Sequence, residues 1–482
     1  MRVGIIGAGL GGVACAVNLA RAGLHDVEVF EQADGPGGVW WANTYPGCEV
    51  DVDSQVYSYS FLPHDWTRTH AGQEEVQRYV ERVIDHFGVR DRIRFGVRVA
   101  EVCWDARSRT YRLGTSAGEA GPFDLVVSCV GMLSNPAVPA WPGLDGFGGP
   151  VFHTSSFDHS VDLRGARVAL VGTGSTACQL APRLAEVAAH LDVYQREAGY
   201  VLPKRARDFT LEERERYRRR PLARRVDRYR LWHAATKATR AFTVDSPEQE
   251  RIRAYHARFL ARTVEDPAVR AALTPAHPYG CKRPVFASDF YPLFNRPDVR
   301  LVPHAVERVT PGGLVAADGV ERPADVIVLA TGFQASRYLA GLEVRGPGGR
   351  TLHEVWGDEP AAFLGMTVAG FPNFAMTYGP NTNGGWSIVA QLERQSEVVV
   401  RMARRLARAR RPAVLDTRPA VAAWYDRAVQ RGLHRRRDAS EAGCHTYFRA
   451  PTGKNVTQWP YSHLSYLAAT KVLPPLGLTR SA

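Results

Sequence analysis

A glycine-rich loop between a buried strand and a helix occurs twice in this chain, and it limits the possible folds more than any other feature. The first copy runs strand, Gly7-x-Gly9-x-x-Gly12, helix, and then a second strand, DVEVFE, that ends at Glu31. Glycines let the backbone approach a pyrophosphate, the helix N-terminus attracts the anion, and an acid after the second strand accepts hydrogen bonds from a ribose. This order of elements predicts a dinucleotide-binding unit of the Rossmann type.

The second copy occupies residues 167–196 and differs from the first at its end. Arg196 lies 24 positions after the first glycine of its loop, as Glu31 lies 24 positions after Gly7. A carboxylate would repel a ribose 2′-phosphate, whereas an arginine can pair with one. We therefore expect FAD at the first loop and NADPH at the second. The residues expected to bind NADPH at the second loop are Gly172, Thr173, Gly174, Ser175 and Thr176.

The rest of the chain agrees with an α/β fold that contains two Rossmann-like domains. Apolar runs at 123–131 and 325–333 predict further buried strands. The stretch between the second unit and the later strand is helical in character. We expect an FAD-binding domain of residues 1–145 and 336–482, an NADPH-binding domain of residues 146–208 and 277–335, and a helical insertion at 209–276.

Two helix starts are legible in the expected insertion. Thr210 and Glu213 have the spacing of a capping box, in which each side chain bonds the backbone of the other. Ser246, Pro247 and Gln249 have the spacing of an N-cap, a proline at the first helical position and a second capping box.

Composition excludes several other classes of protein. The formal charge is +12, but the densest basic run, residues 214–225, has no accompanying helix-turn-helix or base-stacking pattern. We interpret the run as a solvated helix face and expect no nucleic-acid partner. The seven cysteines are scattered without a C-x-x-C pair, and no apolar run has membrane-spanning length. These features predict a reduced, soluble, cytoplasmic protein with no disulfide framework and no metal site; they do not indicate an oligomeric state.

Two further segments resemble the class B flavin monooxygenases, and within them the type I Baeyer–Villiger monooxygenases. GGVWWANTYPGCEVDVDS, residues 37–54, is similar to a family segment that lies along the flavin, which implies flavin contacts for Gly38 and Trp40. FGGPVFHTSSFD, residues 147–158, is similar to the family fingerprint F-x-G-x-x-x-H-x-x-x-W-P/D. Phenylalanine stands where the Baeyer–Villiger pattern has tryptophan, as in many flavin N-oxygenases. The fingerprint residues are Phe147, Gly149, His153, Phe157 and Asp158.

The segment GCKRPVFASDFYPLFNRPDVRL, residues 280–301, resembles the part of the family that carries the catalytic arginine. The resemblance implies that Arg283 is this arginine, that Lys282 touches the NADP 2′-phosphate, and that Asp51 is the aspartate beside the flavin. It also implies a flavin contact for Tyr57. An NADP-contacting tryptophan of the branch is replaced by Tyr447.

The resemblance implies insertion of one oxygen atom of O2 next to a ketone carbonyl, through a flavin peroxide, to give an ester or lactone. Arg283 would stabilise the anionic peroxide and the tetrahedral adduct, and Asp51 would hold the guanidinium in place. Three alternatives stay open: an N- or S-oxygenating flavin monooxygenase, a flavoprotein reductase or NADPH oxidase, and a nonenzymatic nucleotide- or nucleic-acid-binding protein. A reductase would need a cysteine pair that the chain lacks.

Overall fold

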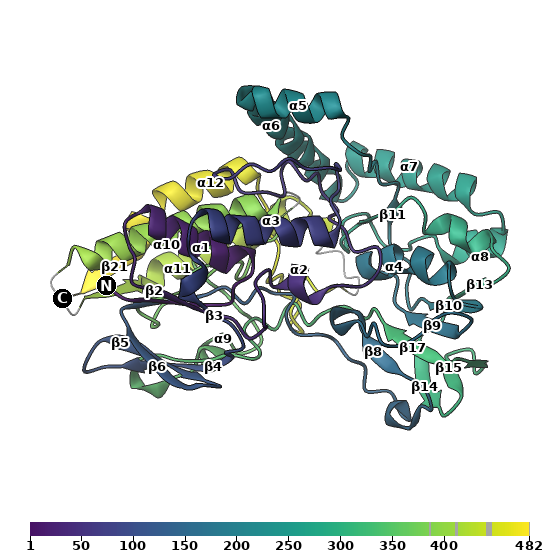
Figure 1. The fold of residues 1–482 in the computed structure, drawn as a ribbon, viewed down its shortest axis with the longest axis horizontal. Coiled ribbons are helices and arrows are strands. Elements are labelled where there is room, and N and C mark those ends of the chain that lie inside the picture. The colour runs from purple at the N-terminus through teal and green to yellow at the C-terminus, as the bar shows by residue number, and fades with distance from the viewer. Residues whose placement is uncertain (385–386, 410–412, 440–445, 482) are drawn as a thin grey trace.

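Two five-stranded parallel sheets form the centre of the molecule. In the computed structural model, which describes residues 1–384, 387–409, 413–439 and 446–481, they lie side by side (Figure 1). The first has the order β19-β7-β1-β2-β3, and all its neighbouring strands are parallel. Its strands are β1 (Val3–Ile6), β2 (Val27–Phe30), β3 (Ile93–Arg94), β7 (Leu125–Ser128) and β19 (Phe374–Met376). The predicted strands at the first loop and at 123–131 therefore share one sheet.

The second sheet repeats the arrangement, with the order β13-β10-β9-β17-β8. Its strands are β8 (Val151–His153), β9 (Arg167–Val171), β10 (His190–Tyr194), β13 (Val299–Val302) and β17 (Val326–Leu329). Strand β9 corresponds to β1, β10 to β2, and β17 to β7. Two parallel sheets with helices confirm the α/β fold of two Rossmann-like units.

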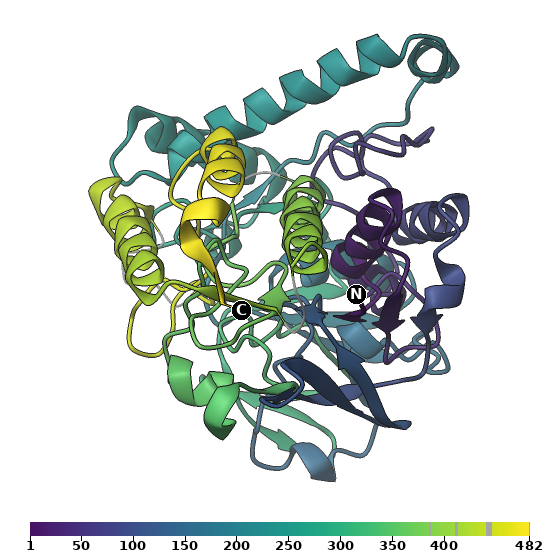
Figure 2. The same cartoon turned by 90° about the vertical axis from the view of Figure 1, so that its left-hand side faces the viewer.

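Each glycine-rich loop leads into a helix that packs on its own sheet. Helix α1 (Leu10–Arg21) lies beside α10 (Ile388–Ala407) over the first sheet, as Figure 2 shows, and the Asn18 side chain donates to the Ser396 hydroxyl at 2.7 Å. On its far side lies α3 (Gln73–His86), and α4 (Ser175–Ala185) covers the second sheet. The large apolar clusters beneath these helices hold each loop between a rigid strand and a rigid helix.

Smaller sheets flank the two central ones. A four-stranded sheet contains β4 (Val99–Asp105), β5 (Thr110–Thr115), β6 (Gly118–Phe123) and β18 (Glu343–Arg345). A three-stranded sheet contains β14 (Val306–Thr310), β15 (Gly313–Ala316) and β16 (Glu321–Pro323). Two strand pairs are β11 (Val201–Leu202) with β12 (Val285–Phe286), and β20 (Val414–Thr417) with β21 (Leu478–Ser481). The remaining α-helices of the described chain outside the expected insertion are α2 (Val39–Ala42), α9 (Leu352–Trp356), α11 (Pro419–Arg435), α12 (His463–Val472) and α13 (Pro474–Gly477).

The stretch expected to be helical contains four helices, and the first two extend away from the sheets (Figures 1 and 2). They are α5 (Leu211–Arg219), α6 (Pro221–Ala238), α7 (Pro247–Thr263) and α8 (Pro267–Ala272). The capping box of Thr210 and Glu213 is confirmed. Ser246 is confirmed as an N-cap, but the second box is wrong, because the Gln249 side chain accepts from the backbone of Asp245 instead.

Ion pairs occupy much of the basic run at residues 214–225. Arg214 pairs with Asp65, and Arg216 pairs with Asp227 at 2.7 Å. The first pair joins α5 to a loop of the first unit, and the second joins α5 to α6; all four side chains keep some solvent exposure. This placement agrees with the interpretation of a charged helix surface.

The fingerprint segment at residues 147–158 belongs to the second sheet rather than to a free connection. Its central residues form β8, the edge strand paired with β17. A Cβ on Gly149 would come within 2.1 Å of the Asp325 carbonyl oxygen, so a larger residue would push the strand away. Phe157 is 9% exposed and meets Phe152 edge-on at 5.1 Å, whereas Asp158 closes an exposed turn. The segment therefore fixes the edge of the sheet.

The cysteines depart from the expectation at one position. Five are free thiols in the structure: Cys15, Cys48, Cys103, Cys129 and Cys178. Cys281 is disulfide-bonded, so the expectation that no disulfide forms is wrong there. In the same described ranges, none of the helices is both long and apolar enough to cross a bilayer.

Candidate functional site

The two glycine-rich loops have the same backbone geometry. Gly7 and Gly172 adopt φ angles of +96° and +118°, which side-chain-bearing residues rarely reach. Their N–H groups donate to the carbonyls of Phe30 and Tyr194, the last residues of β2 and β10. Helices α1 and α4 then begin after Gly9 and Gly174 with no capping side chain. Each helix N-terminus thus leaves backbone donors for an anion.

The ends of β2 and β10 correct the sequence alignment by one residue. Ile6 pairs with Phe30 in the first sheet, and Val171 pairs with Tyr194 in the second. The residue that corresponds to Glu31 is therefore Gln195, and Arg196 lies one position beyond it. The count of 24 positions is misleading because the second unit is one residue shorter between its loop and the end of its second strand.

Glu31 and Gln195 use their side chains differently. The buried Glu31 carboxylate accepts from the backbone N–H of Ala8 at 2.7 Å and from that of Ala33 at 2.9 Å. It ties the first loop to the turn after β2. The Gln195 amide instead donates to the Ala272 carbonyl at the end of α8, at 2.8 Å. Arg196, the next residue, is exposed.

Gly38, Trp40 and Tyr57 gather beside the first loop. Gly9 and Gly37 form an isolated parallel bridge, and a Cβ on Gly38 would lie 3.0 Å from the Gly9 Cα. The Trp40 indole N–H donates to the Tyr57 hydroxyl at 3.0 Å, and burial raises the pKa of Tyr57. These residues form one wall against the loop that the sequence assigns to FAD.

Arg283 and Asp51 form an ion pair across the two units. Asp51 lies between Trp40 and Tyr57 in the chain of the first unit, and Arg283 precedes β12 of the second unit. Arg283 keeps 42% of its side chain accessible, so it is held by Asp51 and still open to a small molecule. The negative charge of Asp51 raises the pKa of Arg283. Burial opposes ionisation of Asp51, but Arg283 holds the pKa of that carboxyl below its usual value.

Two tyrosines from the C-terminal part of the chain complete the surroundings of Arg283. Burial raises the pKa of both Tyr378 and Tyr447, and the positive charge of Arg283 opposes this rise in each case. The Tyr378 hydroxyl contacts Asn383 at 3.1 Å. Tyr447, which the resemblance assigns to NADP contact, therefore lies beside Arg283.

Lys204 is a part of this site that the sequence did not reveal. Its side chain is 5% exposed and donates to the Glu49 carboxylate at 2.7 Å and to the Val50 carbonyl at 2.6 Å. Burial lowers the pKa of Lys204, and its charge helps to keep Asp51 ionised. A buried lysine is rare without a function or a partner, and this chain has only five lysines, so composition held the one available signal.

Lys282 meets Glu197, the residue after Arg196, just beyond the end of β10. The Lys282 ammonium donates to the Glu197 carboxylate at 2.5 Å, with 23% and 30% of the two side chains accessible. The structure thus brings Lys282 to Glu197, three residues after the end of β10 and one after Arg196 in the chain. Neither Glu197 nor its pairing with Lys282 was expected from the sequence.

His153 of the fingerprint has its ring nitrogens engaged by neighbouring groups. The backbone N–H of Ser155 donates to Nδ1 at 3.1 Å, so the proton is on Nε2, which donates to the Gly332 carbonyl at 3.1 Å. Burial lowers the pKa of His153. The ring joins β8 to the turn after β17 in its neutral form.

A cavity of about 220 Å³ opens near the ion pair, between the first unit and the helical segment. Asp53 and Gln55, just after Asp51, form one side, while Tyr217 of α5 and Leu231 of α6 form the other. Burial raises the pKa of Asp53 to about 6. Asp53 places this cavity two residues along the chain from Asp51.

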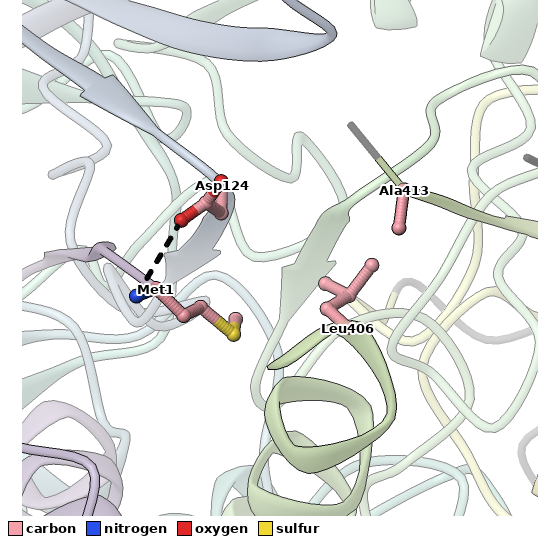
Figure 3. A pocket seen from close by; sticks show the side chains of 4 residues that line it. All are labelled: Met1, Asp124, Leu406 and Ala413. Atoms are coloured by element: carbon pink, nitrogen blue, oxygen red, sulfur yellow. Dashed lines mark ion pairs between the residues drawn. The ribbon is translucent and has the colours of Figure 1, made fainter. Parts of the chain in front are cut away.

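A second cavity, shown in Figure 3, lies away from the loops. It has a volume of about 10 Å³ and is lined by Met1, Asp124, Leu406 and Ala413. Met1 and Asp124 lie just before the N-terminal ends of β1 and β7. The glycine-rich loops follow the C-terminal ends of β1 and β9. A space of this size holds about one water molecule. In the described ranges there is also no cluster of three metal-ligating side chains.

The chain is similar to known proteins over nearly its whole length. Residues 1–211 match the model of a family described as flavin-binding monooxygenase-like. A Baeyer–Villiger monooxygenase of Streptomyces coelicolor is 38% identical over 473 residues, which cover 98% of this chain and 91% of that protein.

Solved structures agree with the same relationship. An oxidised steroid monooxygenase bound to NADP is 29% identical, with a TM-score of 0.88 and 99% coverage of both chains. A cyclohexanone monooxygenase from Rhodococcus sp. Phi1 bound to NADP+ is 27% identical, with a TM-score of 0.89, and the match covers 100% of this chain and 99% of that one. The similarity therefore includes both loops and the segments that carry Asp51 and Arg283.

Proposed function

Because this chain belongs to the flavin-binding monooxygenase family, in the group of the Baeyer–Villiger enzymes, we propose that it oxygenates a ketone with FAD, NADPH and O2. One oxygen atom is inserted next to the carbonyl to give an ester or lactone, and the other leaves as water. The observation that carries the proposal is the Arg283–Asp51 pair, which joins the two nucleotide-binding units and leaves 42% of the Arg283 side chain accessible.

The residues present fit both cofactors. The first loop has free helix-terminal donors, a close Gly9–Gly38 approach and the acid Glu31, as a dinucleotide with an unmodified ribose requires. The second has the same donors with Arg196 and Lys282 at its end, which suit a 2′-phosphate. We assign Gly7, Gly9, Gly12, Glu31, Gly38, Trp40 and Tyr57 to FAD, and Gly172, Thr173, Gly174, Ser175, Thr176, Arg196, Lys282 and Tyr447 to NADPH.

When bound and reduced, the flavin supplies the activation of O2 and the transfer of one oxygen atom. Arg283 stabilises negative charge on the attacking oxygen and on the carbonyl oxygen of the substrate as the new bond forms. Its raised pKa keeps it protonated throughout, and preorganised cationic donors of this kind lower the barrier for charge development. Asp51 orients the guanidinium, and the walls from Trp40 and Tyr57 help to exclude water.

N- or S-oxygenation is the alternative, and Phe157 in the fingerprint is the feature that favours it. Phe157 packs in the core of the second unit beneath β8, so its identity is explained by packing rather than by chemistry. The Arg283–Asp51 pair favours the ketone reaction, because an electrophilic oxygen donor needs no cation. A product assay with one ketone and one amine separates the two: ester from the ketone supports the proposal, and N-oxide alone contradicts it.

We further propose that the chain is divided as the sequence suggests, with residues 1–145 and 336–482 around FAD, 146–208 and 277–335 around NADPH, and 209–276 as a helical insertion. The separate sheets and the four consecutive helices support this division. A cytoplasmic location is supported by the five free thiols, with Cys281 as the exception.

A further inference from the structure

Three charged side chains lie at the end of β10, where the sequence expects the 2′-phosphate of NADPH. Arg196 and Lys282 are cations, and Glu197, which follows Arg196 in the chain, is an anion that already binds the lysine. Gln195 is turned inward and donates to the Ala272 carbonyl. Arg196 and Glu197 are therefore the first accessible side chains after the strand.

The Glu197 carboxylate affects how well this end of the site distinguishes a ribose 2′-phosphate from an unmodified ribose. A 2′-phosphate carries close to two negative charges and gains from each cation, but it must displace or lie beside Glu197 to reach Lys282. An unmodified ribose has no such conflict, because its 2′-hydroxyl can donate to the carboxylate, as it does to the acids of NAD-binding units. The local net charge is +1 with Glu197 and would be +2 without it.

We propose that Glu197 sets the coenzyme preference of this protein: it weakens the advantage of NADPH over NADH, so that NADH also serves as reductant. The inference rests on the proposed function for the location of the second nucleotide site. Glu197 is a further residue of this site, and neither the glycine motif nor the 24-position spacing from Gly172 to Arg196 identifies it. Glu197 is a specificity-determining residue, and its effect is on the binding of the adenosine end.

The test measures nucleotide binding to the FAD-loaded protein and to its Glu197→Gln variant. Dissociation constants are determined for NADPH and NADH, and for adenosine 2′,5′-bisphosphate and 5′-AMP as probes of the adenosine end alone. Removing one like charge a few ångströms from the phosphate is expected to tighten NADPH and the bisphosphate by about ten-fold or more. NADH and 5′-AMP are expected to change by less than about two-fold, or to bind more weakly.

Two further variants keep the result interpretable. Lys282→Met is expected to weaken the bisphosphate selectively, with 5′-AMP unchanged. Glu307→Gln removes an exposed acid from β14 in the separate three-stranded sheet and is expected to leave all four constants unchanged. A Glu197→Gln variant with unchanged NADPH binding, or with all four ligands tightened equally, would overturn the inference.

The outcomes also separate this inference from the proposed reaction. If the coenzyme preference shifts as expected while no ketone is oxygenated, the proposed reaction fails and the role of Glu197 stands. If ester forms normally but the preference does not shift, only the role of Glu197 fails. If none of the four nucleotides binds at millimolar concentration, the second site itself is misplaced and both proposals are overturned.

Discussion

The two glycine-rich units share a sheet order and a loop geometry, and they differ in the residues just after the second strand. In the first unit, the Glu31 carboxylate folds back and binds the loop backbone, so the acid is part of the loop's own structure. In the second, the corresponding Gln195 binds α8, and the charged residues Arg196 and Glu197 come after it. The same backbone scaffold can therefore serve two different nucleotides, and the residues beyond its second strand distinguish them. Arg283 and Asp51 then join the two units.

The largest expected effect comes from breaking that junction. Arg283→Ala removes the cation that stabilises developing negative charge, so ester formation is expected to fall on the order of 10³-fold. NADPH oxidation is expected to persist, with hydrogen peroxide as the product. Product formation and peroxide release are measured together by chromatography and a peroxidase assay. Arg308→Met, an exposed arginine on β14, is the control; ester formation by Arg283→Ala at the unaltered rate would contradict the assignment.

A substitution of Lys204, which lies in the second unit, tests the same junction of Arg283 and Asp51. Lys204→Met leaves Glu49 without its closest cation and frees the segment that carries Asp51. Breaking a buried ion pair by removing one partner costs about 3 kcal/mol of unfolding free energy. We expect this loss in denaturant titration, together with a larger share of NADPH consumed as peroxide. Lys237→Met on α6 exchanges an exposed lysine and should change neither quantity; an equal effect of both variants would remove Lys204 from the site.

Exchanging the two residues that directly follow the second strands tests the difference between the two units. Glu31→Gln removes one of two carboxylate acceptors in the first unit, and Gln195→Glu places a carboxylate against the Ala272 carbonyl in the second. Each change is expected to cost about 2 kcal/mol, because a buried polar group loses its partner. The FAD content, read from the visible absorbance, should fall for Glu31→Gln and not for Gln195→Glu. The reverse pattern would show that the two units have been assigned to the wrong nucleotides.

The smallest effect concerns pH and the cavity beside the junction. Burial raises the pKa of Asp53 to about 6 in the folded protein, so the folded state binds this proton more tightly than the unfolded state does. Both states are protonated well below pH 4 and ionised well above pH 6, so the folded protein loses stability as pH rises between these values. The loss is about 1 kcal/mol after solvent screening. Asp53→Asn should therefore raise the unfolding free energy at pH 8 and leave it nearly unchanged at pH 4.

Asp298 provides a control of opposite sign for that experiment. Hydrogen bonds from Arg296 hold the pKa of Asp298 below its usual value, so its contribution is present at neutral pH and disappears as pH falls. Asp298→Asn should lower the unfolding free energy at pH 8 rather than raise it. The same sign for both variants would mean that the burial of Asp53 does not destabilise its charge.

Local patterns in the sequence predict the loops, the helices and the residue types of the site. The glycine spacing gives the two loops because each is formed by a few adjacent residues, and the Thr210 cap is predicted for the same reason. Contacts between distant segments are not predictable in this way: Lys204 and Glu49 are 155 positions apart and meet only after both units fold. The one-residue difference that places Gln195 opposite Glu31 is likewise visible only in the strand register. Strand β8 is too short to show a periodic pattern.

The most direct test of the central claim is an oxygen-transfer assay with the FAD-loaded protein, NADPH and ¹⁸O2 on a panel of aryl, linear and cyclic ketones. Mass spectrometry of the products measures where the label goes. We expect an ester or lactone that carries one ¹⁸O atom from the wild-type protein, and on the order of 10³-fold less of it from Arg283→Ala. Release of labelled hydrogen peroxide with no ester from any ketone, while an amine is oxygenated by both proteins, would contradict it.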